Sequence, residues 1–125
     1  MGDLSIFSTS KTSTRNTGNR GEEFVCKKLL AKGLRILDRN VREKFAEIDI
    51  IAEDGDTLCF VEVRTRKDTR LGHPVETITA QKQRTVRRAA EAYLARRNII
   101  NRPIRFDVAT IVWDSEEFMY WENAF

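Results

Sequence analysis

The segment that decides the fold runs from Glu47 to Arg64 and reads EIDIIAEDGDTLCFVEVR. Two apolar stretches flank the Asp-Gly dipeptide of residues 54–55. Asp-Gly favours the positive backbone dihedrals that a tight hairpin requires. The segment therefore predicts two antiparallel strands joined by a turn at residues 53–56.

Acidic side chains occur on both predicted strands. Side chains alternate between the two faces of a strand, so Glu47 and Asp49 share one face of the first strand. For the same reason, Glu62 and Arg64 share one face of the second strand. Pairing the strands could bring Asp49 and Glu62 side by side. Acidic residues are depleted in strands, so their presence on both predicted strands requires a reason. A hard divalent cation such as Mg²⁺ would supply one, because it takes carboxylate oxygens as ligands.

The remaining pattern predicts an α/β fold with a mixed central sheet flanked by helices. Residues 1–17 are rich in Ser and Thr and are expected to form a flexible tail before a single domain at 18–125. Expected helices span 19–32 and 79–97, and expected strands span 34–37, 40–51, 57–66, 105–112 and 118–121. Helices before and after a central sheet are typical of this architecture.

Glu22 lies in the first predicted helix and allows two interpretations. At 100° per residue, it falls at the centre of the apolar set Phe24, Val25, Cys26, Leu29 and Leu30. A carboxylate directed at the core must be paired or bound to a cation. Alternatively, Glu22 remains solvated in the first turn, where its charge favours the helix N-terminus.

Positive charge is concentrated in one part of the chain. The whole 125-residue sequence has a formal net charge of +3, but residues 64–105 contain twelve Lys and Arg against three acids. Such a surplus attracts phosphate backbones, and a solvated helical face is the alternative. The residues expected to contact nucleic acid are Arg66, Lys67, Arg70, Arg84, Arg87 and Arg88, and the track could continue to Arg96 and Arg97. We expect recognition of the DNA backbone or its shape, because no base-reading helix or aromatic platform is evident.

The cysteines and the apolar residues limit the kinds of protein that this sequence can encode. Cys26 and Cys59 lack the spacing of a zinc site and are expected to be buried free thiols. We recognise no signal peptide and no apolar stretch that would span a membrane, so we expect a cytoplasmic protein. The apolar residues Tyr120, Trp121 and Phe125 could either form a homodimer interface or close the core.

From Thr17 onward the chain resembles the bacterial YraN family, whose fold is similar to that of Holliday-junction resolvases and other PD-(D/E)xK nucleases. The matching stretches are Thr17-Gly18 followed by Glu22, Glu47-Ile-Asp-Ile-Ile51, Phe60-Val-Glu-Val-Arg64, Thr79-Ala-Gln-Lys82, Arg105-Phe-Asp-Val108 and Asn123-Ala-Phe125. The resemblance implies a restriction-endonuclease-like fold.

The resemblance also implies roles for individual residues. Glu22, Asp49 and Glu62 would hold Mg²⁺ or Mn²⁺ together with the backbone carbonyl of Val63, and Glu47, Gln81 and Lys82 would support them. Arg64 stands where many such nucleases have lysine. Arginine cannot act as a general base because its pKa is too high, but it can clamp a phosphate.

The resemblance thus predicts a metal-dependent endonuclease that hydrolyses phosphodiester bonds in DNA, on branched or single-stranded intermediates. The cation would acidify a water for in-line attack on phosphorus. The alternative is a catalytically silent nucleic-acid-binding or protein-interaction module on the same fold, because a family resemblance does not establish activity.

Overall fold

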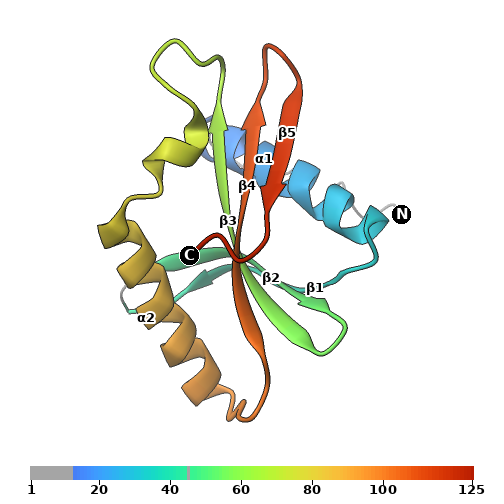
Figure 1. Ribbon diagram of the computed structural model, residues 1–125, viewed down its shortest axis with the longest axis vertical. Coiled ribbons are helices and arrows are strands. Elements are labelled where there is room, and N and C mark those ends of the chain that lie inside the picture. Colours follow the sequence, from blue (N-terminus) through green and yellow to red (C-terminus); the bar gives the residue numbers. More distant parts are fainter. Residues whose placement is uncertain (1–12, 45) are drawn as a thin grey trace.

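The computed structural model describes residues 13–44 and 46–125, in which a five-stranded sheet carries one long helix on each face (Figure 1). The strands lie in the order β1 (Arg35–Arg42), β2 (Glu47–Asp54), β3 (Thr57–Arg66), β4 (Ile104–Val112) and β5 (Glu117–Trp121). Only β3 and β4 pair in parallel among these neighbours. This mixed sheet confirms the expected α/β class and is compatible with a restriction-endonuclease-like fold.

Each face of the sheet has its own hydrophobic core. On one face, Val25 and Leu29 of α1 (Ser13–Ala31) pack with Val61 and its neighbours. On the other, Val86 and Tyr93 of α2 (Ala80–Arg96) pack around the strands, and a short 3₁₀ helix, η2 (Pro74–Thr77), precedes α2. Residues of the central strands such as Ile50, Phe60 and Ala109 are completely buried because both faces are covered there.

The first helix differs from its expected limits. It begins at Ser13, whereas the sequence pattern predicts a tail to residue 17 and a helix from residue 19; residues 1–12 lie outside the described part. Its end is as expected, because Gly33 adopts a φ of +97° and Leu34 N donates to Leu29 O at 3.0 Å. Leu30 is 54% exposed, so it does not belong to the apolar face of α1 in which the sequence pattern placed it.

The expected division of residues 34–51 into two strands is wrong in its boundaries. β1 continues to Arg42, and the turn lies between Arg42 and Glu47. A bulge between Ile36 and Asp38 shifts the register, and Asn40 has a φ of +51° within the strand. These two irregularities interrupt the alternation from which strand limits are read.

The later elements match their expected limits closely. β3 spans the expected residues, Thr79 caps α2 by accepting a hydrogen bond from Lys82 N, and β4 and β5 each begin one residue early. Cys26 and Cys59 are buried and unpaired as expected, and burial raises the pKa of each thiol to about 11. None of the helices in the described residues is long and apolar enough to cross a membrane.

A buried carboxylate ties the C-terminal segment to the sheet. Asp107 is completely buried and accepts hydrogen bonds from Arg105 Nε, the Tyr120 hydroxyl at 2.6 Å and Asn123 N at 3.0 Å. The ring of Phe125 stacks on Phe106 with centroids 5.2 Å apart. Tyr120 and Phe125 therefore help to close the core, and the two motifs around Asp107 and Asn123 have a structural role.

Candidate active site

The candidate site lies where β2 and β3 separate. Their antiparallel pairing runs from Asp54↔Thr57 to Ile50↔Val61, and one further step of that register would set Asp49 opposite Glu62. At that point Val63 N donates to Asp49 Oδ2 at 2.9 Å instead of to a backbone carbonyl. The side chain of Asp49 thus replaces a ladder hydrogen bond and opens a pocket between the strands.

The pocket has a volume of about 440 Å³ and is lined by acidic and basic side chains from four elements. Its lining residues are Glu22, Ala46, Glu47, Asp49, Glu62, Val63, Arg64, Thr65, Lys82 and Thr85. Every metal-site residue expected from the family resemblance is in this set. We call it the acidic pocket.

Glu62 is the most deeply buried carboxylate in the pocket, with 1% of its surface exposed. Burial and the nearby Asp49 raise its pKa to about 9, against a smaller lowering by Lys82. Lys82 Nζ lies 3.7 Å from Glu62 Oε2, which is too long for a hydrogen bond. Oε2 is buried and receives no hydrogen bond from any described residue.

Glu22 is buried at 8% exposure, so the interpretation that directs it to the core is correct and the solvated one is wrong. Burial and Asp49 raise its pKa to about 7. Arg39 Nη2 lies 3.6 Å from Glu22 Oε1, and that buried oxygen also receives no hydrogen bond within the described part of the chain. Helix α1 therefore places in the same pocket a second buried carboxylate with an oxygen that has no hydrogen bond.

These donors are carboxylate oxygens, the type of ligand that a hard divalent cation takes. Buried carboxylate oxygens without hydrogen bonds are costly unless a ligand satisfies them, and Mg²⁺ and Mn²⁺ prefer oxygen. Among the described residues, no three acidic, histidine or cysteine side chains are already arranged as a formed metal group. Each carboxylate instead lies against a partner within the protein. Glu22 lies near Arg39 and Glu62 near Lys82. Asp49 accepts a hydrogen bond from Val63 N.

Two basic residues lie at the pocket, and one expected neighbour does not. Arg64 shares the strand face of Glu62, and its buried Nε has no hydrogen-bond partner in the described structure. Lys82 reaches the pocket from α2 as expected. Gln81 is exposed and lies outside the lining, so its supporting role stays a prediction, whereas Thr85, one turn after Lys82, lines the pocket.

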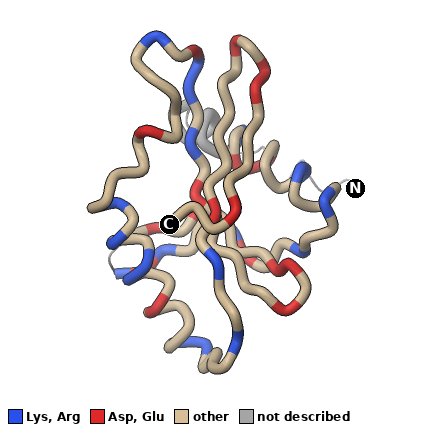
Figure 2. Tube along the Cα trace, in the orientation of Figure 1, with Lys and Arg blue, Asp and Glu red and all other residues tan. Residues whose placement is uncertain are grey.

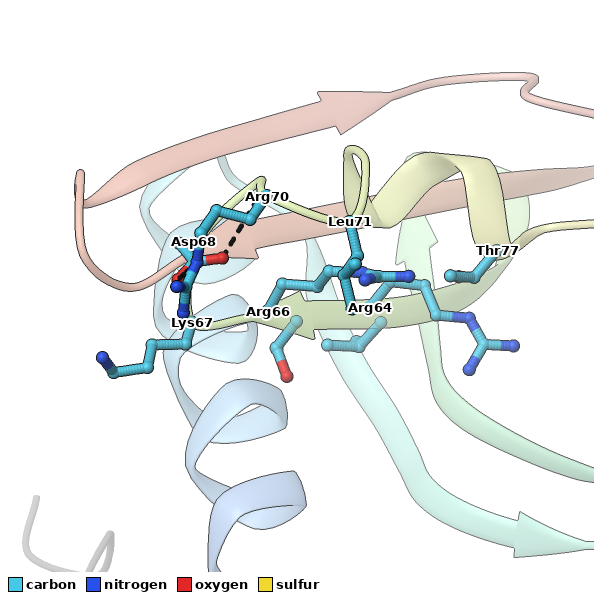
Figure 3. Close-up of a pocket in the computed structure, with 9 residues that line it drawn as sticks. Arg64, Arg66, Lys67, Asp68, Arg70, Leu71 and Thr77 are labelled. Atoms are coloured by element: carbon cyan, nitrogen blue, oxygen red, sulfur yellow. Dashed lines mark hydrogen bonds and ion pairs between the residues drawn. The ribbon is translucent and has the colours of Figure 1, made fainter.

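A second cleft of about 600 Å³ adjoins the acidic pocket and shares Val63, Arg64 and Thr65 with it (Figure 3). We call it the basic cleft. It is lined by Val63, Arg64, Thr65, Arg66, Lys67, Asp68, Arg70, Leu71 and Thr77. The three residues expected to bind nucleic acid after β3, Arg66, Lys67 and Arg70, are thereby brought together.

The basic residues of α2 divide into two groups. Lys and Arg gather along the end of β3, the loop after it and α2 (Figure 2). Arg84, Arg87 and Arg88 are exposed near the N-terminal half of the helix, and the Arg87 guanidinium lies 4.7 Å from the centre of the Phe106 ring.

At the C-terminal end of α2, Arg96 pairs with Glu43, and Arg97 pairs with Asp38 at 3.3 Å. The extension of a phosphate track to these two residues stays a prediction, and a phosphate there would compete with the acids of β1 and of the turn after it.

Sequence reasoning missed two residues that shape the pocket. Arg39 reaches Glu22 because the bulge in β1 sets it opposite Ile50, on the α1 face of the sheet. Gly21 lets α1 approach β3, since a Cβ there would lie 2.8 Å from Thr65 Cγ2. For Gly21, the available signal was a glycine immediately before a buried acid. For Arg39, the broken alternation of β1 conceals which face of the sheet it lies on.

Comparison with known proteins supports the resemblance drawn from the motifs. Residues 21–111 match the model of "Uncharacterised protein family UPF0102", which is the YraN family. A UPF0102 protein of Symbiobacterium thermophilum is 48% identical over 98 residues, covering 78% of this chain and 83% of that protein. One from Dictyoglomus turgidum is 38% identical over 117 residues, covering 90% of this chain and 99% of that protein.

Proposed function

Because the chain belongs to the UPF0102 family and carries an acidic pocket beside a basic cleft, we propose that it is a divalent-metal-dependent nuclease that hydrolyses phosphodiester bonds in DNA. One observation carries the proposal. Glu22, Asp49 and Glu62 come from three different elements and converge on one pocket, where two of them present buried oxygens without hydrogen bonds.

A structural role alone does not account for this convergence. Burying one carboxylate costs free energy, and burying two next to a third costs more unless a cation compensates. Elsewhere in this protein, the fully buried Asp107 accepts several hydrogen bonds. Glu22 and Glu62 each present a buried oxygen that lacks such a hydrogen bond, which supports a ligand-binding role.

Asp49 and Glu62 would hold Mg²⁺ or Mn²⁺, with Glu22 and the carbonyl of Val63 completing the donor set. When bound, the cation supplies Lewis acidity that lowers the pKa of a water and offsets charge on phosphoryl oxygens. The hydrogen bond from Val63 N fixes the orientation of the Asp49 carboxylate at the point where the pairing of β2 and β3 ends.

The two basic residues would act on the substrate. Arg64 would bind a non-bridging phosphate oxygen and stabilise the charge that develops in the transition state, because its guanidinium is permanently charged. Lys82 would serve as a second point charge from the other side of the pocket. Neither residue is needed as a general base in this scheme.

A second candidate function is a silent nucleic-acid-binding module, and one observation favours it. Arg39 and Lys82 already lie beside Glu22 and Glu62, so the protein's own cations partly neutralise the carboxylates. A module that binds DNA only through its basic cleft would keep those pairs. The two candidates differ in whether a divalent cation enters the pocket.

The test is a cleavage assay with linear, nicked, single-stranded and four-way DNA in Mg²⁺ or Mn²⁺. The nuclease proposal predicts cleavage that is abolished by EDTA and lost in Glu62→Gln and Asp49→Asn. Asp56→Asn is the matched control, because Asp56 is exposed in the β2–β3 turn. Binding without cleavage on every substrate would favour the silent module. Activity that survives Glu62→Gln would contradict the assigned site.

A further inference from the structure

The basic cleft adjoins the acidic pocket along a shared wall. Val63, Arg64 and Thr65 line both cavities. The cleft extends from this shared wall along the end of β3 and under the loop that joins β3 to η2. Two neighbouring groups of one ligand could therefore occupy the two cavities.

The charge of the cleft is strongly positive and only partly neutralised. Four of its lining residues are cations, Arg64, Arg66, Lys67 and Arg70, and Asp68 is its single acid. Asp68 pairs with Arg70 at 3.1 Å, and Lys67 lies 3.8 Å from Asp114. Arg66 forms no ion pair within residues 13–44 and 46–125, and the buried Nε of Arg64 lacks a hydrogen bond. The cleft thus presents two guanidinium groups with unused donors.

Arg64 and Arg66 also have a spacing that suits a nucleotide chain. They lie two residues apart on one strand, so they share a face and are separated by about 6.7 Å along it. This is similar to the spacing of consecutive phosphates in an extended single strand. Arginine binds phosphate through paired donors, so each guanidinium can engage one phosphate.

We infer that the basic cleft binds a second phosphate of the substrate strand, next to the phosphodiester in the acidic pocket, and so selects an extended single-stranded segment. The inference rests on the proposed function for the identity of the substrate. Arg66 and Arg70 hold the second phosphate, and Arg64 holds the phosphodiester in the acidic pocket. Leu71, which is 85% exposed on the rim of the cleft, offers an apolar contact to the attached sugar or base.

The first arm of the test measures binding to the cleft alone, by amide NMR titration in EDTA. The probes are thymidine 5′-monophosphate, thymidine 3′-monophosphate, thymidine and inorganic phosphate. We expect at least one nucleotide to shift the amides of residues 64–71 and to bind more tightly than inorganic phosphate, and thymidine to shift none of them. Arg66→Gln and Arg70→Gln should each weaken nucleotide binding about tenfold.

Arg84→Gln is the matched control, since it removes the same charge from an exposed position outside the cleft. Its effect should stay under about twofold. Equal weakening by Arg84→Gln and Arg66→Gln would overturn the inference in favour of a diffuse electrostatic surface. Inorganic phosphate binding as tightly as both nucleotides would overturn it in favour of a site for free anions.

The second arm adds Ca²⁺ and compares thymidine dinucleotides with and without a terminal phosphate. A terminal phosphate at either the 5′ or the 3′ end should increase the affinity of the dinucleotide by about fivefold or more. This gain in affinity should disappear in Arg66→Gln. Absence of the gain in the wild type, with nucleotide binding intact in EDTA, would overturn the placement of the second phosphate next to the acidic pocket. Dinucleotide binding that Ca²⁺ does not tighten at all would instead contradict the metal site of the proposed function. If no nucleotide binds in EDTA, the inference that the basic cleft binds a phosphate is contradicted, regardless of the result with Ca²⁺.

Discussion

Gly21 of α1 and Thr65 of β3 lie so close together that a Cβ on Gly21 would sit 2.8 Å from Thr65 Cγ2. This contact is one residue away from Glu22, and Thr65 lines both the acidic pocket and the basic cleft. The missing side chain therefore allows the helix to bring Glu22 to the strands that carry Asp49 and Glu62. The geometry of the site depends on this approach.

We expect Gly21→Ala to destabilise the protein by about 1–3 kcal/mol, because the added methyl group would force the helix away from Thr65. Helix propensity alone predicts the opposite sign, since alanine is favoured over glycine by about 1 kcal/mol. In a Thr65→Ser background the clashing methyl group is absent, so Gly21→Ala should become neutral or stabilising. Urea denaturation of the four proteins measures this; an equal effect in both backgrounds would refute the close contact.

The pKa of Glu62 predicts how stability varies with pH in the absence of divalent metal. Its pKa is raised from 4.5 to about 9 in the folded protein, chiefly by burial. The folded state therefore holds this proton more tightly than the unfolded state, and the contribution is full below pH 4.5 and is lost as pH rises towards 9. The free energy of unfolding of the wild type should fall over that range relative to Glu62→Gln, which has no such proton. A constant difference between the two proteins, measured by urea denaturation from pH 5 to pH 9, would contradict this assignment.

Removal of the Lys82 charge should raise the pKa of Glu62 further, because the ammonium group 3.7 Å away favours the carboxylate form. The measurement is the titration of the Glu62 side-chain carboxyl carbon by NMR in Lys82→Gln and in the wild type. Gln81→Ala serves as the control, since Gln81 is exposed and outside the pocket. A shift of similar size in Gln81→Ala would show that the assignment of helix residues to the pocket is wrong.

Asp107 should matter for stability and not for metal binding. Asp107→Asn leaves Arg105 without its buried partner, and loss of one member of a buried pair costs about 3–5 kcal/mol. Tyr120→Phe removes a single hydrogen bond to the same carboxylate and should cost about 1–2 kcal/mol. Thermal and urea unfolding give both values. Loss of Mn²⁺ binding by folded Asp107→Asn at low temperature would contradict a purely structural role.

Much of the fold could be predicted because its signals are local. The Asp-Gly turn and the alternation of β3 give the hairpin, and Thr79 marks the start of α2 through its side-chain cap. Asp49 and Glu62 could be placed together because the period of a strand is two residues. Helical periodicity offered a core-directed Glu22 as one of two interpretations, and only the family resemblance placed it near these two acids.

The errors have physical causes that sequence patterns do not carry. The bulge after Ile36 and the positive φ of Asn40 break the alternation of β1, which hides its true limits and the reach of Arg39. The ion pair of Arg97 with Asp38 joins residues distant in the chain, so a count of charges overestimates the basic surface. The hydrogen bonds of Asp107 are likewise long-range, and the motif around it has no local signature of a structural role.

Binding of a divalent cation in the acidic pocket can be measured by titration with Mn²⁺, followed by electron paramagnetic resonance. The wild-type protein should bind Mn²⁺ at the pocket with an affinity that falls at least about tenfold in Asp49→Asn and in Glu62→Gln. Asp56→Asn, with the same loss of charge as Asp49→Asn, should bind as the wild type does. Identical Mn²⁺ binding by the wild type, Asp49→Asn and Glu62→Gln would contradict the account.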